Sequence, residues 1–345
     1  MMPNQSLSPL ELLRSDSSNS QATARPVVSL GEGSDPRVVA GALAAHHAGI
    51  ADVILVGDTA TIRAELAAQN ASVSLGVAIH DPMTSPLTPE FASAFHELRR
   101  HKGVDADKAL QEVQNSLVYA AMLVRLGHAT GTVSGAVATT SDVVRTAIQV
   151  IGKAPDAAMV SSFFLMLPPK DAPQDARAML YSDCGLVIDP SSDDLVAIAA
   201  ASANSCRALL RCEPNIAMLS FSTMGSAKHP AVTKVATAAA SLREQYPALN
   251  VDGELQFDTA FAPDIAARKA PNSPVAGHAN VMIFPNLDAG NIGYKITQRI
   301  GGYAAIGPVL QGLSRPANDL SRGCTAQDVT EMIAVTILQA ASSIE

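Results

Sequence analysis

The sequence predicts an α/β protein built from two blocks of buried strands and covering helices, with largely parallel sheets. Short β-branched apolar runs alternate with alanine-rich segments of helical periodicity, which is the order found in parallel sheets with crossover helices. Tryptophan is absent, and aromatic residues make up only 4% of the chain. The chain has 345 residues, more than the roughly 250–300 that one hydrophobic core usually holds, so we expect two domains.

The first block follows a polar, serine-rich segment at the start of the chain. Residues 1–25 lack the apolar core of a targeting peptide, so we interpret them as a mobile N-terminal arm. A strand is expected at 26–30, an alanine-rich helix at 38–49 and a buried strand at 53–56, and this order implies a parallel sheet. Helical spacing and turn-forming glycines then predict helices at 89–100, 106–126 and 143–151, with a turn at 127–135.

The second block follows a short linker, expected at 152–156 (GKAPD). Apolar runs and one alanine-rich segment predict its elements: strands at 158–167, 179–188, 216–221, 255–257 and 281–284, and a helix at 194–210. A glycine-rich stretch at 301–312 then leads into a last helix at about 326–341.

Charge and composition argue against several classes of protein. The net charge is −8 and no long basic run is present, whereas nucleic-acid binding needs clustered lysine and arginine. No apolar run approaches the roughly 18 residues of a membrane span. The four cysteines form no CxxC pair and have no histidine-rich spacing, so we expect reduced thiols in a cytoplasmic protein, without disulfides or a metal site. They are Cys184, Cys206, Cys212 and Cys324.

The most informative segment is 312–328 (GLSRPANDLSRGCTAQD). Thr325 directly precedes the last helix and Asp328 follows three residues later, which is the spacing of a capping box. Because a helix start favours anions, a phosphoryl group there could meet Arg322 in bidentate fashion, beside Ser321. Asp328 could then accept a proton. On local spacing alone, a purely capping carboxylate remains the more frequent role for such an aspartate.

A second candidate site lies at 127–145 (GHATGTVSGAVATTSDVVR). Its glycines allow close approach of the backbone to a ligand, and hydroxyl groups stand beside them. The GK[ST] ending of a nucleotide P-loop is missing, which argues against ATP hydrolysis. A turn followed by a Ser/Thr-capped helix would explain the same residues. The hydroxyl candidates for a phosphate or acyl-phosphate pocket are Ser134, Thr139 and Thr140.

Other motifs are weaker. The basic cluster at 99–102 (RRHK) could hold a polyphosphate arm, although cations are also favoured at any helix C-terminus. The GEG at 31–33 follows a strand, but position 36 is proline where a full GxGxxG needs glycine, which argues against NAD binding. Neither Cys184 nor Cys324 has an adjacent histidine or lysine, so a nucleophilic thiolate is not indicated.

Six segments resemble the phosphate acetyl/butyryltransferase family, in the family's order; they lie at 131–152, 159–166, 182–203, 251–271, 280–302 and 307–328. The resemblance runs from about residue 26 to the end. It implies two α/β domains of the isocitrate/isopropylmalate dehydrogenase type with the active site in the cleft between them. The first domain would take 26–154 and 312–345, and the second would be inserted at 155–311.

The resemblance also implies roles for single residues. The LSRGC…D motif places the catalytic groups on Ser321, Arg322 and Asp328, and the two arginines that contact coenzyme A fall on Arg99 and Arg145. Asn291 and Lys295, of the GNIGYK segment, join the candidates for the acyl-phosphate pocket. Ala138 stands where many members have a histidine (VSGAxH), so no imidazole is available there.

The activity implied by the resemblance is acetyl-CoA + phosphate = acetyl phosphate + CoA, in a ternary complex with Asp328 as the base for the CoA thiol. Coenzyme A and acetyl-CoA would be substrates; no metal or permanently bound cofactor would be needed, and a homodimer is expected. Three alternatives stay open. They are a phosphate butyryltransferase with a roomier acyl pocket, a metal-dependent NAD dehydrogenase of the same fold, and a non-catalytic protein that binds CoA or acyl phosphate.

Overall fold

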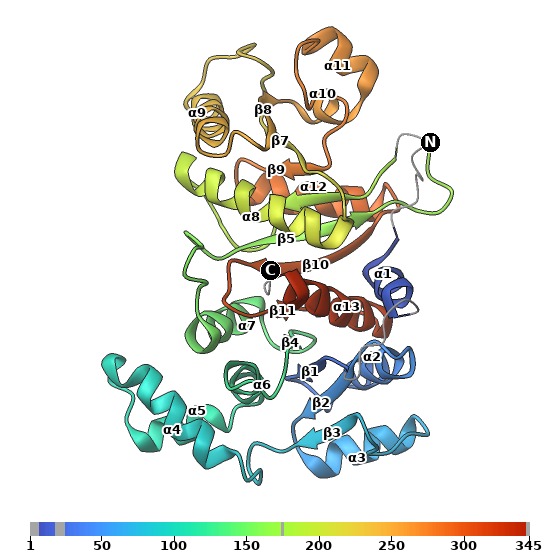
Figure 1. Cartoon of the computed structure of the whole chain (residues 1–345), viewed down its shortest axis with the longest axis vertical. Helices are drawn as coiled ribbons and strands as arrows, with labels where there is room; N and C mark the ends of the chain where they lie inside the picture. Colours follow the sequence, from blue (N-terminus) through green and yellow to red (C-terminus); the bar gives the residue numbers. More distant parts are fainter. Residues whose placement is uncertain (1–6, 18–24, 174–175, 343–345) are drawn as a thin grey trace. The chain divides into compact units, whose positions relative to one another are not determined.

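The computed structural model describes residues 7–17, 25–173 and 176–342, which form two compact units (Figure 1). The terminal unit is built from described residues of 8–155 and 313–342, and the central unit from Leu7 and those of 156–312. Each unit contains a sheet covered by helices, as the alternating sequence pattern predicts. No helix within the described ranges is both long and apolar enough to cross a membrane.

A five-stranded parallel sheet frames the terminal unit, in the order β11-β4-β1-β2-β3. Its strands are β1 (Val27–Leu30), β2 (Asp52–Val56), β3 (Val77–His80), β4 (Gly131–Ser134) and β11 (Ala317–Asp319). Strand β11 comes from near the end of the chain and pairs with β4, so that Asp319 lies opposite Ser134. Because all five strands are parallel, their carboxyl ends meet at one edge, where ligands bind in open sheets of this kind.

Helices cover both faces of this sheet, and Figure 1 shows α13 and α2 on one side with α6 on the other. The helices are α1 (Pro9–Ser17), α2 (Pro36–His47), α3 (Thr59–Ala68), α4 (Thr88–Arg99), α5 (Ala106–Val113), α6 (Ser116–Arg125), α7 (Thr140–Thr146) and α13 (Ala326–Ser342). A 3₁₀ turn at Arg100–Lys102 extends α4, and a π-helical segment at Ala147–Ile151 extends α7.

Helix α13 is the core helix of the terminal unit. Every residue from 329 to 338 is buried, most of them apolar but Glu331 among them, so this stretch of the helix is covered on all sides. It packs closely on α2, because a Cβ atom at Gly41 would lie only 2.5 Å from Cβ of Val329. Only glycine therefore allows this contact, and the contact fixes the start of α13 relative to the loop before α2.

The expected mobile arm over 1–25 is wrong for Pro9–Ser17, which forms α1. Leu10 and Leu12 are buried, and the N–H of Leu10 donates to Glu331 Oε2 on α13 at 3.1 Å. Two contacts hold this helix against the terminal unit. The leucines are buried, and the Glu331 carboxylate binds the first turn of the helix. Residues 1–6 and 18–24 of the expected arm lie outside the described residues.

The central unit contains a six-stranded mixed sheet in the order β10-β5-β6-β9-β7-β8. Its strands are β5 (Ser161–Leu167), β6 (Met179–Ser182), β7 (Asn215–Leu219), β8 (Asn250–Leu255), β9 (Val281–Ile283) and β10 (Ala304–Gln311). Strand β5 runs antiparallel to both β6 and β10, and the other pairs are parallel. The helices of this unit are α8 (Ser192–Leu210), α9 (Pro230–Gln245), α10 (Phe257–Phe261), α11 (Pro263–Lys269) and α12 (Leu287–Arg299).

The structure corrects several expected elements. The glycine-rich stretch at 127–135, expected as a turn, contains β4, and the stretch at 301–312 contains β10. The strand expected at 255–257 is β8 and ends at Leu255. The single helix expected at 106–126 is two helices, because Asn115 caps the start of α6 by accepting from the N–H of Leu117 at 2.9 Å.

Candidate active site

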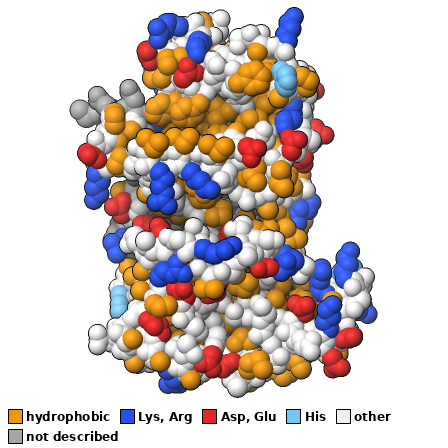
Figure 2. Space-filling model, turned by 180° about the vertical axis from the view of Figure 1, so that it is seen from behind, with side chains coloured by type: hydrophobic (Ala, Val, Ile, Leu, Met, Phe, Trp, Pro, Cys, Tyr) orange, Lys and Arg blue, Asp and Glu red, His pale blue; other side chains and the backbone are white. Residues whose placement is uncertain are grey.

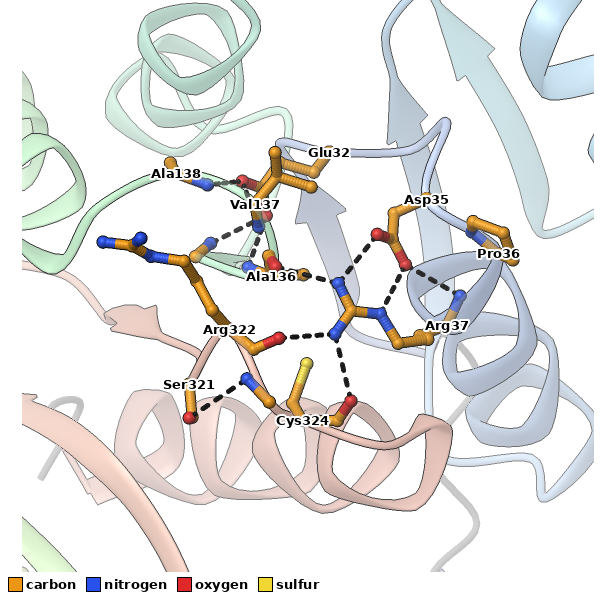
Figure 3. Close-up of polar contacts among 12 residues, drawn as sticks. Glu32, Asp35, Pro36, Arg37, Ala136, Val137, Ala138, Ser321, Arg322 and Cys324 are labelled. Carbon is orange, nitrogen blue, oxygen red and sulfur yellow. Dashed lines mark hydrogen bonds and ion pairs between the residues drawn. The ribbon is translucent and has the colours of Figure 1, made fainter.

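Three loops meet beyond the carboxyl ends of β1, β4 and β11 in the terminal unit (Figure 3). They are the segments 31–37, 135–139 and 320–325. The third contains two of the predicted catalytic residues, and the second contains part of the predicted hydroxyl cluster. Backbone and side-chain hydrogen bonds connect all three loops.

The turn after β11 is compact and carries two exposed side chains, Ser321 and Arg322. The N–H of Gly323 donates to Ser321 Oγ at 3.3 Å, and the N–H of Cys324 donates to the Ser321 carbonyl at 2.9 Å. Ser321 Oγ acts as an acceptor here, so its own hydroxyl proton remains able to donate to a ligand. In Figure 3 the Arg322 guanidinium points away from Arg37.

Asp328 forms the capping box that its spacing predicts. Asp328 Oδ2 accepts from the N–H of Thr325 at 2.8 Å and from Thr325 Oγ1 at 2.9 Å. In return, the N–H of Asp328 donates to Thr325 Oγ1 at 3.2 Å. One carboxylate oxygen, Oδ2, therefore makes both of the capping contacts of the Asp328 carboxylate. The side chain is only partly buried, so the second oxygen can serve another role.

The loop after β4 wraps its backbone around one carboxylate, that of Glu32. Glu32 Oε2 accepts from the N–H groups of Gly135 and Ala136 at 2.8 and 2.7 Å. Glu32 Oε1 accepts from those of Val137 and Ala138 at 3.0 and 2.6 Å. Four consecutive amides form an anion nest, and an internal carboxylate fills it. These amides are therefore not free for a substrate anion, contrary to the expectation that the glycine-rich backbone approaches a ligand.

The hydroxyl candidates beside this loop differ in their surroundings. Ser134 is 5% exposed at the end of β4. Thr139 is the N-cap of α7, where Thr139 Oγ1 accepts from the N–H of Asp142 at 3.1 Å and donates to Asp142 Oδ2 at 2.8 Å. The capped-helix interpretation is thus confirmed for Thr139. Thr140 begins α7 and lies beside the carboxyl group of Asp319.

Arg37 joins the three loops through their carbonyl groups (Figure 3). Its Nη1 donates to the carbonyls of Arg322 at 2.7 Å and Cys324 at 3.2 Å, and its Nη2 donates to that of Ala136 at 2.8 Å. Two further bonds reach Asp35, which lowers the Asp35 pKa and raises that of Arg37. The site turn is thus fixed through its backbone, leaving the Arg322 side chain free.

Asp319 is a buried residue that borders the loops of the site. It is the last residue of β11 and is 0% exposed. Burial raises its pKa to about 7. Neither Asp319, Glu32 nor Arg37 was among the residues predicted for the site. Glu32 belongs to the GEG motif, whose spacing was informative only about a nucleotide loop.

A family model described as "Phosphate acetyl/butaryl transferase" matches residues 15–337. The chain belongs to this family. A phosphate acetyltransferase of Paracoccus denitrificans is 48% identical over 310 residues, covering 90% of this chain and 93% of that protein. The phosphate acetyltransferase of Bacillus subtilis is 41% identical over 309 residues, with the same two coverages of 90% and 93%.

Solved structures of the same family share the fold. A phosphotransacetylase from Streptococcus pyogenes matches with a TM-score of 0.87 at 37% identity, over 96% of this chain and 98% of that one. The EutD phosphotransacetylase from Staphylococcus aureus matches with a TM-score of 0.85 at the same identity and coverage. A 4-hydroxythreonine-4-phosphate dehydrogenase from Klebsiella pneumoniae, at 14% identity and a TM-score of 0.53, is similar in fold alone. The predicted class of two α/β units is confirmed.

The remaining residues expected from the family pattern lie elsewhere. Arg145, on α7, pairs with Asp142, and Arg99 is the partly exposed last residue of α4. Asn291 and Lys295 belong to α12 of the central unit. Asn291 Nδ2 donates to the Cys184 carbonyl at 3.2 Å, and Lys295 Nζ lies 5.7 Å from the ring centroid of Tyr294.

The surroundings of two cysteines disfavour the thiolate form. All four cysteines are free thiols. Burial raises the pKa of Cys184 well above its usual value and also raises that of Cys324, so both thiols stay neutral at physiological pH. Across the described ranges, no three His, Cys, Asp or Glu side chains are grouped to hold a metal ion.

Proposed function

We propose that this chain catalyses the reversible transfer of an acetyl group between acetyl-CoA and inorganic phosphate. The observation that carries the proposal is the complete LSRGC…D segment. It folds into a compact turn and helix start that present Ser321, Arg322 and Asp328. Relatives named phosphate acetyltransferase match nine tenths of the chain, which supports acetyl as the transferred group.

In the direction of acetyl-CoA formation, the thiol of CoA must lose its proton. Its pKa is about 8.5, so a base is needed at neutral pH, and Asp328 takes this proton. The sulfur then attacks the carbonyl carbon of acetyl phosphate and forms a tetrahedral adduct. The adduct collapses as the bond between the carbonyl carbon and the phosphate oxygen breaks, releasing phosphate and leaving the thioester. The acetyl group thus passes directly between the substrates.

The two residues of the turn stabilise the charges that develop. The Ser321 hydroxyl donates a hydrogen bond to the oxyanion of the adduct, an interaction worth about 2.7–4 kcal/mol where single donors are removed. The Arg322 guanidinium binds the phosphoryl oxygens, because its planar donors match them in bidentate fashion. Phosphate is a good leaving group, so correct positioning contributes more than activation. The contacts of Arg37 to the Arg322 and Cys324 carbonyls supply that positioning.

Coenzyme A is the second substrate, and Arg99 and Arg145 are proposed to hold its phosphate groups. Asn291 and Lys295 remain candidates for the acyl-phosphate pocket through the sequence resemblance alone. No residue of the proposed mechanism needs a metal ion. A cytoplasmic location fits the four free thiols.

Thioester formation from CoA tests the proposal. Purified enzyme is given CoA with either acetyl phosphate or butyryl phosphate, and the ultraviolet absorbance of the thioester is followed. We expect kcat/KM for acetyl phosphate to exceed that for butyryl phosphate by at least about tenfold, since excluding two methylenes from a small pocket contributes a few kcal/mol. A preference for butyryl phosphate would instead assign a butyryltransferase. Binding of CoA without any turnover would assign a non-catalytic binding protein.

We also propose that two copies of the chain associate as a homodimer. Ile292, Ile296 and Ile300, four residues apart on and just after α12, are 58%, 53% and 84% exposed. Hydrophobic side chains also gather in the upper part of the face drawn in Figure 2. Such a row costs free energy in water unless a partner covers it.

Light scattering after gel filtration tests this assembly. The expected mass is twice that of one chain, and Ile296→Glu is expected to shift it to one chain because a charge would be buried at the contact. Asp193→Lys, an equally drastic change on α8 outside the row, serves as the matched control and should remain a dimer. A wild-type monomer would contradict the proposal.

A further inference from the structure

The carboxyl group of Asp319 is the feature of the terminal unit that the proposed mechanism leaves unexplained. The residue is 0% exposed, and both of its carboxylate oxygens are buried without a hydrogen-bond partner of ordinary geometry among the described residues. A buried carboxylate without partners costs several kcal/mol in its charged form. Native proteins rarely keep such a group without a reason in its function.

The surroundings of Asp319 place it between two loops of the candidate site. Oδ1 lies against the backbone of the β4 loop, because a Cβ atom at Gly135 would come 2.1 Å from it. On the other side, the N–H of Leu320 donates to the Ser134 carbonyl at 2.7 Å, which fixes the start of the catalytic turn. Asp319 therefore contacts the loop that Glu32 holds and directly precedes the turn that carries Arg322.

Few groups influence the charge of this carboxyl group. Among the described residues, the charged side chains that act on it are Glu32, from the loop after β1, and Arg322, from the turn. Thr140, from α7, and the N–H of Leu320 favour its charged form. Burial outweighs them and raises the Asp319 pKa to about 7. The group therefore changes charge in the neutral range, where few carboxyl groups do.

A phosphoryl dianion bound at Arg322 changes this balance. It neutralises the guanidinium that favours the Asp319 carboxylate, and it adds negative charge nearby. Both effects favour the neutral acid, so the Asp319 pKa rises in the complex. By linkage, binding of the anion takes up a proton, and loss of that proton weakens the binding.

We propose that Asp319 is a positioning residue that couples occupation of the phosphoryl site to its own protonation, so that the acyl phosphate binds tightly only while this buried carboxyl group is neutral. When Asp319 is neutral, its carboxyl group no longer repels the phosphoryl anion bound at the turn. The neutral form also removes the cost of a buried charge. This inference rests on the proposed function of the Ser321–Arg322 turn.

The sign of the pH effect follows directly. Below the pKa of Asp319 the carboxyl group is neutral and KM for acetyl phosphate is low. Above it the group is charged and KM rises. Acetyl phosphate is a dianion throughout the neutral range, so its own titration does not enter. Titration of the CoA thiol changes kcat at saturating acetyl phosphate, whereas titration of Asp319 changes KM for acetyl phosphate. The two titrations are therefore measured separately.

The decisive kinetic experiment measures KM for acetyl phosphate at saturating CoA across roughly pH 6–9. For the wild type we expect KM to rise on the order of tenfold through the neutral range. Asp319→Asn, which is uncharged at every pH, should keep a low and nearly constant KM. Glu331→Gln is the matched control: Glu331 is another buried carboxyl group of this unit with a raised pKa, but it contacts α1. Its KM profile should follow the wild type.

A binding experiment tests the same coupling without turnover. Acetyl phosphate is titrated calorimetrically into wild type, without CoA, in buffers of different ionisation enthalpy near neutral pH. We expect net proton uptake in the wild type and in Glu331→Gln, and none in Asp319→Asn. Equal KM profiles for wild type and Asp319→Asn, or binding without proton uptake by the wild type, would overturn the inference. Because this readout needs no catalysis, it can fail while acetyl transfer is observed, and it can succeed if acetyl transfer is absent.

Discussion

Replacing Asp328 by asparagine is expected to lower kcat for acetyl-CoA formation at least about a hundredfold, the range for loss of a general base. The amide has nearly the same shape as the carboxylate but cannot accept the thiol proton. Affinity for CoA should change little, because the residue is proposed to act on the proton and not on the cofactor's phosphates. Steady-state kinetics with acetyl phosphate and CoA, together with direct CoA binding, measure the two quantities separately.

The capping box provides a matched control for this variant. Asp328 Oδ2 binds the N–H and hydroxyl of Thr325, so Asp328→Asn also weakens the start of α13. Thr325→Ala breaks the same box from its other side and leaves the carboxylate in place. Losing a cap costs about 0.5–2 kcal/mol, so both variants should melt a few degrees lower, and only Asp328→Asn should lose turnover. Equal turnover losses, or a purely thermal effect at Asp328, would show that the base lies elsewhere.

Much of the frame of the fold could be predicted because its signals are local. The runs at 26–30 and 53–56 are apolar, β-branched and bounded by turns, and they are strands β1 and β2. The sequence predicts a turn over β4 because glycines at 127, 131 and 135 punctuate the short apolar run. Gly131 is required there by α13, since a Cβ atom would lie 2.3 Å from Thr336 Cγ2. A contact across some two hundred residues leaves no local pattern.

The residues of the candidate site also fall into a group that the sequence predicts and a group that it does not. Ser321, Arg322 and Asp328 stand in one short segment, so spacing and the resemblance together were enough to select them. Glu32 acts on amides more than a hundred residues away, and Arg37 reaches a carbonyl 285 positions along the chain. Their roles depend on how β1, β4 and β11 are ordered in the sheet. Strand order is a property of the whole unit that no window of sequence contains.

Replacing Arg322 by alanine is expected to lower kcat/KM for acetyl phosphate by about a hundredfold or more. Each charge-assisted hydrogen bond lost from the phosphoryl group costs about 1.5–3 kcal/mol, and a bidentate guanidinium makes two. Arg322→Lys keeps the positive charge but not the planar fork, so its loss should be smaller, on the order of tenfold. Initial rates over a range of acetyl phosphate concentrations, at saturating CoA, give both values.

Because the backbone of the turn is held independently, Arg322→Ala tests the role of the side chain alone. Arg37 holds the carbonyl of residue 322 at 2.7 Å, and that bond survives any change of the side chain. The melting temperature of Arg322→Ala should therefore stay close to that of the wild type. Added guanidinium should restore part of its activity, because it can occupy the vacated position. Arg63→Ala, which removes an exposed arginine from α3 of the same unit, controls for net charge and should leave kcat/KM unchanged. If Arg322→Ala retains wild-type kinetics, the phosphoryl group binds elsewhere in the protein.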